Sequence, residues 1–119
     1  FRYVKSELHY LLADSEATAL IYHAAFATRV AEILPDLPRL RVLIQIADES
    51  GNELLDGAVD YEDALASVSA QPPPVRHCPD DLYVLYTGGT TGMPKGVLWR
   101  QHDIFMTSFG GRNLMTGEP

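Results

Sequence analysis

The residues best suited to chemistry lie in the last third of the chain, where residues 86–96 read Tyr-Thr-Gly-Gly-Thr-Thr-Gly-Met-Pro-Lys-Gly. The glycines leave room for several backbone N–H groups to point at one ligand. The threonine hydroxyls can donate hydrogen bonds or bind a cation, and Lys95 adds a positive charge. Amides, hydroxyls and one cation together suit a polyphosphate. The stretch therefore predicts a phosphate-binding loop.

The segments on either side of this loop are apolar and predict strands. Residues 82–86 (Leu-Tyr-Val-Leu-Tyr) precede it, and Val97, Leu98 and Trp99 follow it. Short apolar runs of this kind are typical of strands. A strand–loop–strand unit over residues 82–100 distinguishes the loop from a flexible linker. The alternative to a phosphate-binding loop is an ordinary turn between two strands, since glycine and threonine are common in turns.

Two other glycine-rich phosphate loops are excluded by spacing. A Walker loop requires Gly-Lys followed by Ser or Thr, whereas Lys95 lies between Pro94 and Gly96. A dinucleotide-binding loop requires Gly-x-Gly-x-x-Gly opening a helix, whereas the glycines at 88, 89 and 92 are spaced differently and lead toward a strand. Because no helix dipole is expected here, the anion would depend on amides, hydroxyls and Lys95.

The composition predicts a globular domain and excludes several functions. The chain has 119 residues and a net charge of −7, with 14 acids and 6 bases in residues 1–81 but 2 acids and 3 bases in residues 82–119. Nucleic-acid binding is not expected, because it needs clustered Lys and Arg. No apolar run reaches the roughly 20 residues of a membrane span. Cys78 is the only cysteine, so no intrachain disulfide can form and a reducing, cytoplasmic setting is predicted.

Periodicity predicts alternating helices and strands before the loop. Helices are expected at residues 3–12, from Ala24 to the prolines at 35 and 38, and at residues 61–69 with Asp60 as the cap. Strands are expected at residues 18–22, covered on both faces, and at 40–46, with a short extended segment at 53–55. A Pro-rich connector at 71–81 leads to the strand at 82–86, and a final helix follows Trp99, itself expected in the core.

This order is typical of a parallel sheet with flanking helices, as in doubly wound α/β domains. Ligands of such sheets gather at the carboxyl ends of strands. The loop begins where the strand at 82–86 ends, so the expected fold and the motif indicate the same place.

The motif from Tyr86 to Val97 resembles the AMP-binding signature of the adenylate-forming superfamily, which includes acyl-CoA synthetases, luciferases and peptide-synthetase adenylation domains. With Gly88 where many members have Ser, and Val-Leu-Trp-Arg at 97–100, it is similar to bacterial fatty-acyl-CoA synthetases. The stretch around Arg2-Tyr3-Val4 and 11–15 resembles the helix that such enzymes place after an Asn-rich strand. The resemblance implies that residues 1–119 are part of an N-terminal AMP-binding domain, a partial flavodoxin-like subdomain.

The resemblance implies an acid–thiol ligase that uses ATP, Mg²⁺ and CoA. A carboxylic acid, expected to be a fatty acid, attacks the α-phosphorus of ATP to give an acyl-adenylate and pyrophosphate, and the CoA thiol then displaces AMP. Lys95 would counter phosphate charge and Thr87 would help to hold Mg²⁺. The remaining residues expected to bind the nucleotide are Gly88, Gly89, Thr90, Thr91, Gly92, Pro94 and Gly96.

The family motifs for adenine, ribose and the adenylation lysine do not occur in the 119 residues. We therefore expect this polypeptide to be inactive by itself, to need the remainder of the same protein, and to self-associate through uncovered apolar faces. Two alternatives stay open. One is a non-catalytic α/β binding or scaffold module with weak phosphate affinity, and the other is an adenylation domain that loads a carrier protein.

Overall fold

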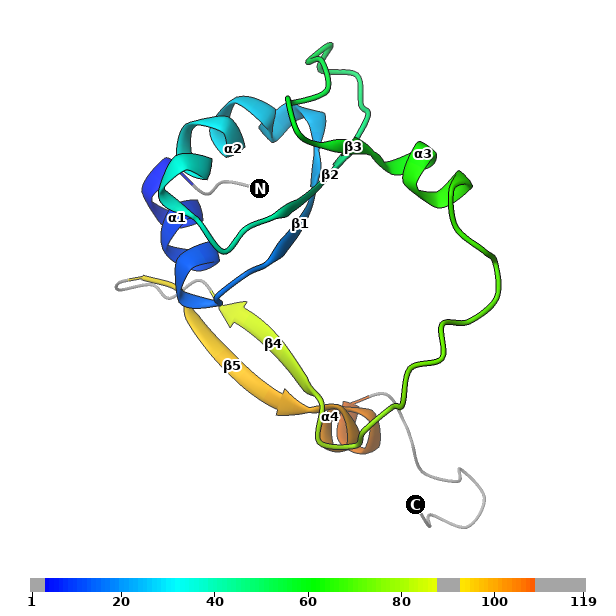
Figure 1. Cartoon of the computed structure of the whole chain (residues 1–119). Coiled ribbons are helices and arrows are strands. Elements are labelled where there is room, and N and C mark those ends of the chain that lie inside the picture. The colour runs from blue at the N-terminus through cyan, green and yellow to red at the C-terminus, as the bar shows by residue number, and fades with distance from the viewer. Residues whose placement is uncertain (1–3, 88–92, 109–119) are drawn as a thin grey trace. The chain divides into compact units, whose positions relative to one another are not determined.

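The computed structural model describes residues 4–87 and 93–108. The chain divides into two compact units, Phe1–Pro72 and Pro73–Pro119, each described separately below. Figure 1 shows the course of the chain, from the blue N-terminal helix through the green α3 to the yellow and orange C-terminal elements.

The first unit is a three-stranded parallel sheet with helices, which confirms the predicted fold class. The strand order is β1-β2-β3, and β1 pairs with β2 from Ala19↔Val42 to His23↔Ile46. The helices and strands are α1 (Lys5–Asp14), β1 (Ala19–His23), η1 (Ala24–Phe26), α2 (Ala27–Ile33), η2 (Leu34–Asp36), β2 (Val42–Ile46), β3 (Val59–Asp60) and α3 (Tyr61–Ala66).

The core of this unit lies on one face of the sheet. Tyr22 of β1 and Leu43 of β2 point to the same side, where they meet Leu12 of α1 together with Val30 and Ile33 of α2. Both helices therefore cover this face. Burial of these apolar side chains is the main term that stabilises the unit.

The opposite face is apolar and exposed, so the prediction that the first strand is covered on both faces is wrong. Ile21, Val42 and Val59 are each about half exposed, at 56%, 49% and 49%. Ile21 and Val59 flank Ile44 in one row across the sheet. The sequence run is largely apolar, as in a doubly covered strand, yet α1 and α2 both pack on the other face of the sheet.

Gln45 is the buried polar residue of this core, with 3% of its surface exposed. Its Oε1 accepts hydrogen bonds from the Tyr22 hydroxyl (3.0 Å) and the Leu55 N–H (3.1 Å), and its Nε2 donates to the Glu53 carbonyl (2.9 Å). Burial raises the pKa of Tyr22 and keeps it the neutral donor. Gln45 thus ties the segment after β2 to the sheet.

These bonds explain why the extended segment expected at 53–55 is not a strand. Its backbone groups bond to the Gln45 side chain, and the third strand, β3, forms later at Val59–Asp60. Asp60 caps α3 as predicted, because its Oδ1 accepts from the N–H groups of Glu62 (2.8 Å) and Asp63 (3.2 Å). The helix ends at Ala66, three residues before the predicted end.

The second unit is a β-hairpin followed by a helix. Strand β4 (Leu82–Thr87) pairs antiparallel with β5 (Lys95–Arg100), and α4 spans Gln101–Ser108. The expectation that the strand at 82–86 joins the parallel sheet is wrong, since it belongs to a separate two-stranded sheet. A connection as short as residues 88–94 allows only antiparallel pairing, because parallel strands need a crossover of a dozen or more residues.

The base of the hairpin is fixed by the end of the Pro-rich segment. The first N–H groups of α4 donate to carbonyls of that segment, Gln101 to Asp81 (2.8 Å) and His102 to Pro79 (3.1 Å). Arg100 pairs with Asp80 at 2.7 Å. Both side chains are at least half exposed, so the two backbone bonds do more than the ion pair to anchor the helix.

We expect Gln45→Leu to lower the free energy of unfolding by about 2–4 kcal/mol, because it leaves the Tyr22 hydroxyl and the Leu55 N–H without their buried acceptor. Tyr22→Phe is the matched control, since it removes one bond and leaves Gln45 bonded to the 53–55 segment, at a cost of about 1 kcal/mol. Urea unfolding measures both. Equal stability of Gln45→Leu and the unmodified protein would contradict the role assigned to Gln45.

Candidate functional site

The candidate site is the end of the hairpin where β4 passes into the loop. Thr87 and Lys95 are the last cross-strand pair of the ladder. Side chains of directly opposed residues lie on the same face, with Cβ atoms about 5 Å apart. A hydroxyl and an ammonium group are thus brought together by pairing across residues 88–94, and both residues are exposed.

The other predicted site residues divide into two groups. Pro94 is described and is buried, next to the exposed Lys95. The five central residues, Gly88, Gly89, Thr90, Thr91 and Gly92, lie outside the described residues. The described part of the loop therefore consists of its two ends, with Pro94 holding the chain directly before Lys95.

Gly96 has a packing role that the sequence does not reveal. It lies opposite Tyr86 in the ladder, and a Cβ at this position would be 3.1 Å from Tyr86 Cζ and 3.3 Å from Val84 Cγ1. The tyrosine ring therefore covers the glycine, an arrangement that compensates for a glycine in a strand. Gly96 adjoins the loop, and its lack of a side chain leaves room for the ring of Tyr86 beside the second strand.

The two lysines of the chain differ in their charged neighbours. Lys5 pairs with Glu32 at 3.5 Å, whereas Lys95 makes no ion pair with any residue that the structure describes. The sequence has no Asp or Glu between residues 82 and 102. The charge of Lys95 is therefore available to an anionic ligand, and Thr87 beside it offers a hydroxyl to such a ligand or its cation.

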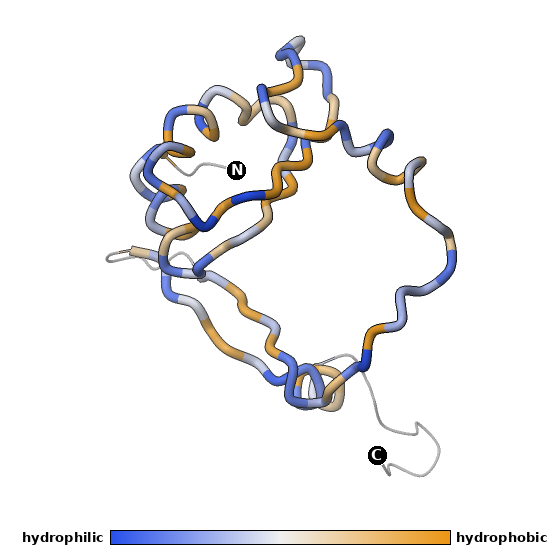
Figure 2. The backbone as a smooth tube through the Cα atoms, viewed as in Figure 1, coloured by the Kyte–Doolittle hydropathy of each residue, from blue (hydrophilic) through white to orange (hydrophobic). Residues whose placement is uncertain are grey.

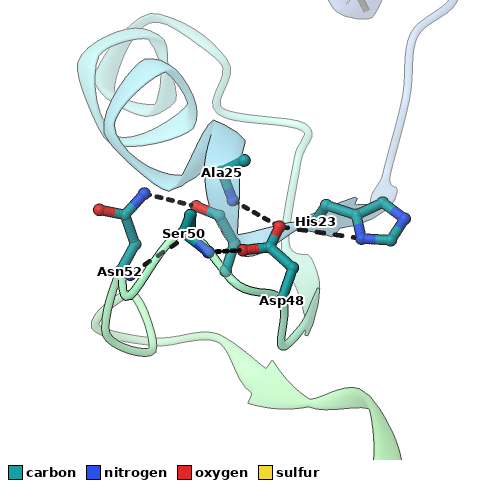
Figure 3. A network of polar contacts seen from close by, with 6 residues as sticks. His23, Ala25, Asp48, Ser50 and Asn52 are labelled. Atoms are coloured by element: carbon teal, nitrogen blue, oxygen red, sulfur yellow. Dashed lines mark hydrogen bonds and ion pairs between the residues drawn. The ribbon is translucent and has the colours of Figure 1, made fainter.

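A second polar group lies at the carboxyl end of the parallel sheet, directly after β1 and β2 (Figure 3). Asp48 Oδ2 accepts from the Ala25 N–H (2.9 Å) and lies 3.9 Å from His23 Nδ1, and Asp48 Oδ1 accepts from the Ser50 N–H (2.9 Å). Asn52 Nδ2 donates to the Ala24 carbonyl (3.0 Å). These bonds join the loop after β2 to the start of the second helical segment.

From the sequence alone, the acidic and polar stretch at residues 48–52, which contains Gly51, predicts no more than a turn. The signal for the network is the Asp-x-Ser-x-Asn spacing from 48 to 52, since such side chains bond backbone N–H groups two residues on. Hydrogen bonds from the Ser50 hydroxyl, the Ala25 N–H and the Ser50 N–H lower the pKa of Asp48. Among the described residues no group of three or more His, Cys, Asp or Glu could hold a metal ion.

Because the pKa of Asp48 is lower in the folded chain than in the unfolded chain, its hydrogen bonds stabilise the loop fully above the ordinary Asp value and progressively less as pH falls through the lowered one. We therefore expect the Ala25 and Ser50 amides to exchange faster below about pH 4. NMR amide exchange measures this after correction for the intrinsic rate. Asp48→Asn is the control and should remove the pH dependence, and a dependence that persists in it would contradict the assignment.

Comparison with known proteins identifies the family of this chain. The model of the AMP-binding enzyme family matches residues 1–115. A medium-chain acyl-CoA ligase from Mycobacterium avium is 98% identical over 119 residues, which are 100% of this chain and 22% of that protein. A medium/long-chain-fatty-acid–CoA/3-oxocholest-4-en-26-oate–CoA ligase from Mycobacterium tuberculosis strain H37Rv is 43% identical over 99% of this chain and 22% of its own length. The chain thus spans about a fifth of these relatives.

Solved structures of CoA ligases and synthetases are also similar to this chain. The anthranilate CoA ligase AuaEII in complex with anthranoyl-AMP has a TM-score of 0.76 and 26% identity over 89% of this chain and 20% of its own. Acetoacetyl-CoA synthetase from Streptomyces lividans has a TM-score of 0.67 and 30% identity over 85% of this chain and 17% of its own. The fold, the motif and the match over residues 1–115 converge, and the chain belongs to the family of adenylate-forming AMP-binding enzymes.

Proposed function

We propose that the chain is the phosphate-binding part of an ATP-dependent acyl-CoA synthetase that activates a medium- or long-chain fatty acid. The observation that carries this proposal is the cross-strand pair of Thr87 and Lys95 at the two ends of the loop, within a chain of the AMP-binding family. The names of the relatives, medium-chain acyl-CoA ligase and medium/long-chain-fatty-acid–CoA ligase, support the substrate class and favour CoA over a carrier protein as acceptor.

The proposed reaction has two steps. A fatty-acid carboxylate oxygen bonds to the α-phosphorus of ATP as the bond from that phosphorus to pyrophosphate breaks. The CoA sulfur then bonds to the acyl carbon as the bond from that carbon to the AMP oxygen breaks, and the thiol loses its proton. In the first step the pyrophosphate group gains negative charge, and a positive group placed beside it stabilises the transition state.

The residues of this chain would act on the phosphate groups. Lys95 would bind the β- and γ-phosphates, and Thr87 would contribute its hydroxyl to Mg²⁺ bound to them. Gly88, Gly89 and Gly92 would permit close backbone approach, Thr90 and Thr91 would donate hydrogen bonds, and Pro94 would hold the chain beside Lys95. Gly96 would support this group through its packing against Tyr86.

Several further properties are proposed with this function. The groups for adenine, ribose and CoA would come from the remainder of a longer polypeptide, since the chain spans 22% of its relatives. The 119 residues alone would then be inactive, and their exposed apolar faces would favour self-association. The single cysteine supports a cytoplasmic setting. None of the helices that the structure describes is long and apolar enough to cross a membrane.

In the full-length ligase we expect Lys95→Ala to lower kcat/KM for ATP in pyrophosphate exchange by about 100-fold, because it removes a charge-assisted contact to the phosphates. The melting temperature should change little, since the side chain is exposed. Lys5→Ala is the matched control, as it removes the other lysine and should leave exchange unchanged. Undiminished exchange in Lys95→Ala would remove Lys95 from the mechanism.

We also expect Thr87→Val to raise the Mg²⁺ concentration needed for half-maximal pyrophosphate exchange by about tenfold, because valine keeps the shape and strand preference of threonine but lacks the hydroxyl. Thr87→Ser keeps the hydroxyl and should restore the Mg²⁺ requirement. Titration of Mg²⁺ at saturating fatty acid measures the effect. An unchanged requirement in Thr87→Val would show that Thr87 does not contact the cation.

A further inference from the structure

Two backbone hydrogen bonds close the end of the β4–β5 hairpin that is remote from the phosphate-binding loop. The Gln101 N–H donates to the Asp81 carbonyl (2.8 Å), and the His102 N–H donates to the Pro79 carbonyl (3.1 Å). We call these four residues the clasp. The clasp joins the residues directly before β4 to the first turn of α4, which follows β5 without a break (Figure 1).

Asp81 holds the carbonyl side of the clasp in place. Its Oδ2 accepts from the Cys78 N–H (3.1 Å), and its own N–H donates to the Cys78 carbonyl (3.0 Å). The neighbouring Asp80 adds an ion pair to Arg100 at 2.7 Å, but both of those side chains are at least half exposed, so the pair contributes little. The Asp81 side chain therefore fixes the turn whose carbonyls receive α4.

The loop of the hairpin is too long to fix the strand pairing by turn geometry. Since β4 ends at Thr87 and β5 begins at Lys95, seven residues, 88–94, connect them, whereas the turns that impose one register have two residues. A slip in register usually costs energy because it moves the apolar side chains to solvent. Here both faces of the ladder carry exposed apolar pairs, so that cost is small.

A slip in register would separate the two described residues of the candidate site. The Thr87–Lys95 pair lies five steps of the ladder, about 17 Å, from the Leu82–Arg100 pair next to the clasp. A slip of two residues keeps every side chain on its face but can place Lys95 opposite Leu85. Lys95 would then lie about 7 Å further along the strand from Thr87.

We propose that the clasp sets the register of β4 against β5 and so holds Lys95 opposite Thr87, with Asp81 and Gln101 as positioning residues for the phosphate-binding site. The clasp acts from the far end of the ladder and touches no residue of the loop. This inference rests on the proposed function only in taking Lys95 as the group that binds the phosphates of ATP.

Disulfide formation in the full-length ligase tests the register without any catalytic readout. The pair Leu85→Cys/Val97→Cys reports the observed register, because directly opposed cysteines are close enough to bond. Leu85→Cys/Lys95→Cys reports the slipped register. Each pair is combined with Gln101→Pro, which removes the N–H of the clasp while proline suits the first residue of a helix. Gln101→Ala keeps the N–H and is the matched control.

We expect Gln101→Pro to lower the yield of the 85–97 disulfide at least about threefold at equal oxidant, and to raise the yield of the 85–95 disulfide. Gln101→Ala should leave both yields within about 1.5-fold of those without a change at 101. Peptide mapping by mass spectrometry measures the yields. Equal yields in Gln101→Pro and Gln101→Ala would overturn the proposal.

Pyrophosphate exchange tests the consequence for the site. We expect Asp81→Ala to raise the KM for ATP about fivefold, the size of one net hydrogen bond, and to leave the KM for fatty acid unchanged. Asp81→Asn keeps an acceptor oxygen and should restore most of the loss. Asp80→Ala is the matched control, since it removes only the exposed ion pair. An equal rise in both KM values would indicate a general loss of structure and would contradict a positioning role.

A double-mutant comparison shows whether Asp81 acts through Lys95. In a Lys95→Ala background, Asp81→Ala should change the KM for ATP by less than about twofold, because the group that it positions is already missing. A further fivefold rise would overturn the proposal. If Lys95→Ala alone leaves exchange unchanged, the proposed function fails, and the disulfide yields still decide whether the clasp sets the register.

Discussion

The antiparallel ladder between β4 and β5 is the constraint on which the candidate site depends. It fixes Thr87 opposite Lys95, and therefore the span that residues 88–94 must close. The residues on either side of Lys95 restrict the backbone at this end of the loop. Pro94 is buried and has a restricted φ angle, and Gly96 packs against the ring of Tyr86. A hydroxyl and a cation are thus positioned by the backbone hydrogen bonds of the ladder, and the described residues at the two ends of the loop include no helix N-terminus.

Local patterns predicted most elements, and non-local contacts account for the errors. Asp60 was identified as a cap because its partners are two and three residues away. The 53–55 segment was misassigned because Gln45, eight to ten residues earlier, takes its backbone groups. Apolar runs identified both hairpin strands, yet hydrophobic periodicity says nothing of the neighbour with which a strand pairs. The packing role of Gly96 was missed because sequence cannot show that an aromatic ring from the opposite strand lies over it.

The loop after β2 is held by two groups of different physical character. Gln45 is buried and uncharged, so its three bonds do not depend on its own ionisation, and their loss would leave polar groups unpaired in the core. Asp48 is charged, and its bonds depend on ionisation (Figure 3). Gln45 anchors the middle of the loop to the core. Asp48 joins the start of the loop to the helical segment after β1. Together they order the carboxyl end of the parallel sheet.

The hairpin itself exposes apolar side chains on both faces. Val84 and Leu98 share one face and Leu85 and Val97 the other, each at least 39% exposed, and Figure 2 shows the apolar stretches in both strands. An isolated two-stranded ribbon is marginally stable in water. The alignment of Thr87 with Lys95 therefore depends on whatever covers these faces. Loss of that packing would separate Thr87 from Lys95, and under the proposed function it would weaken phosphate binding without changing a residue of the loop.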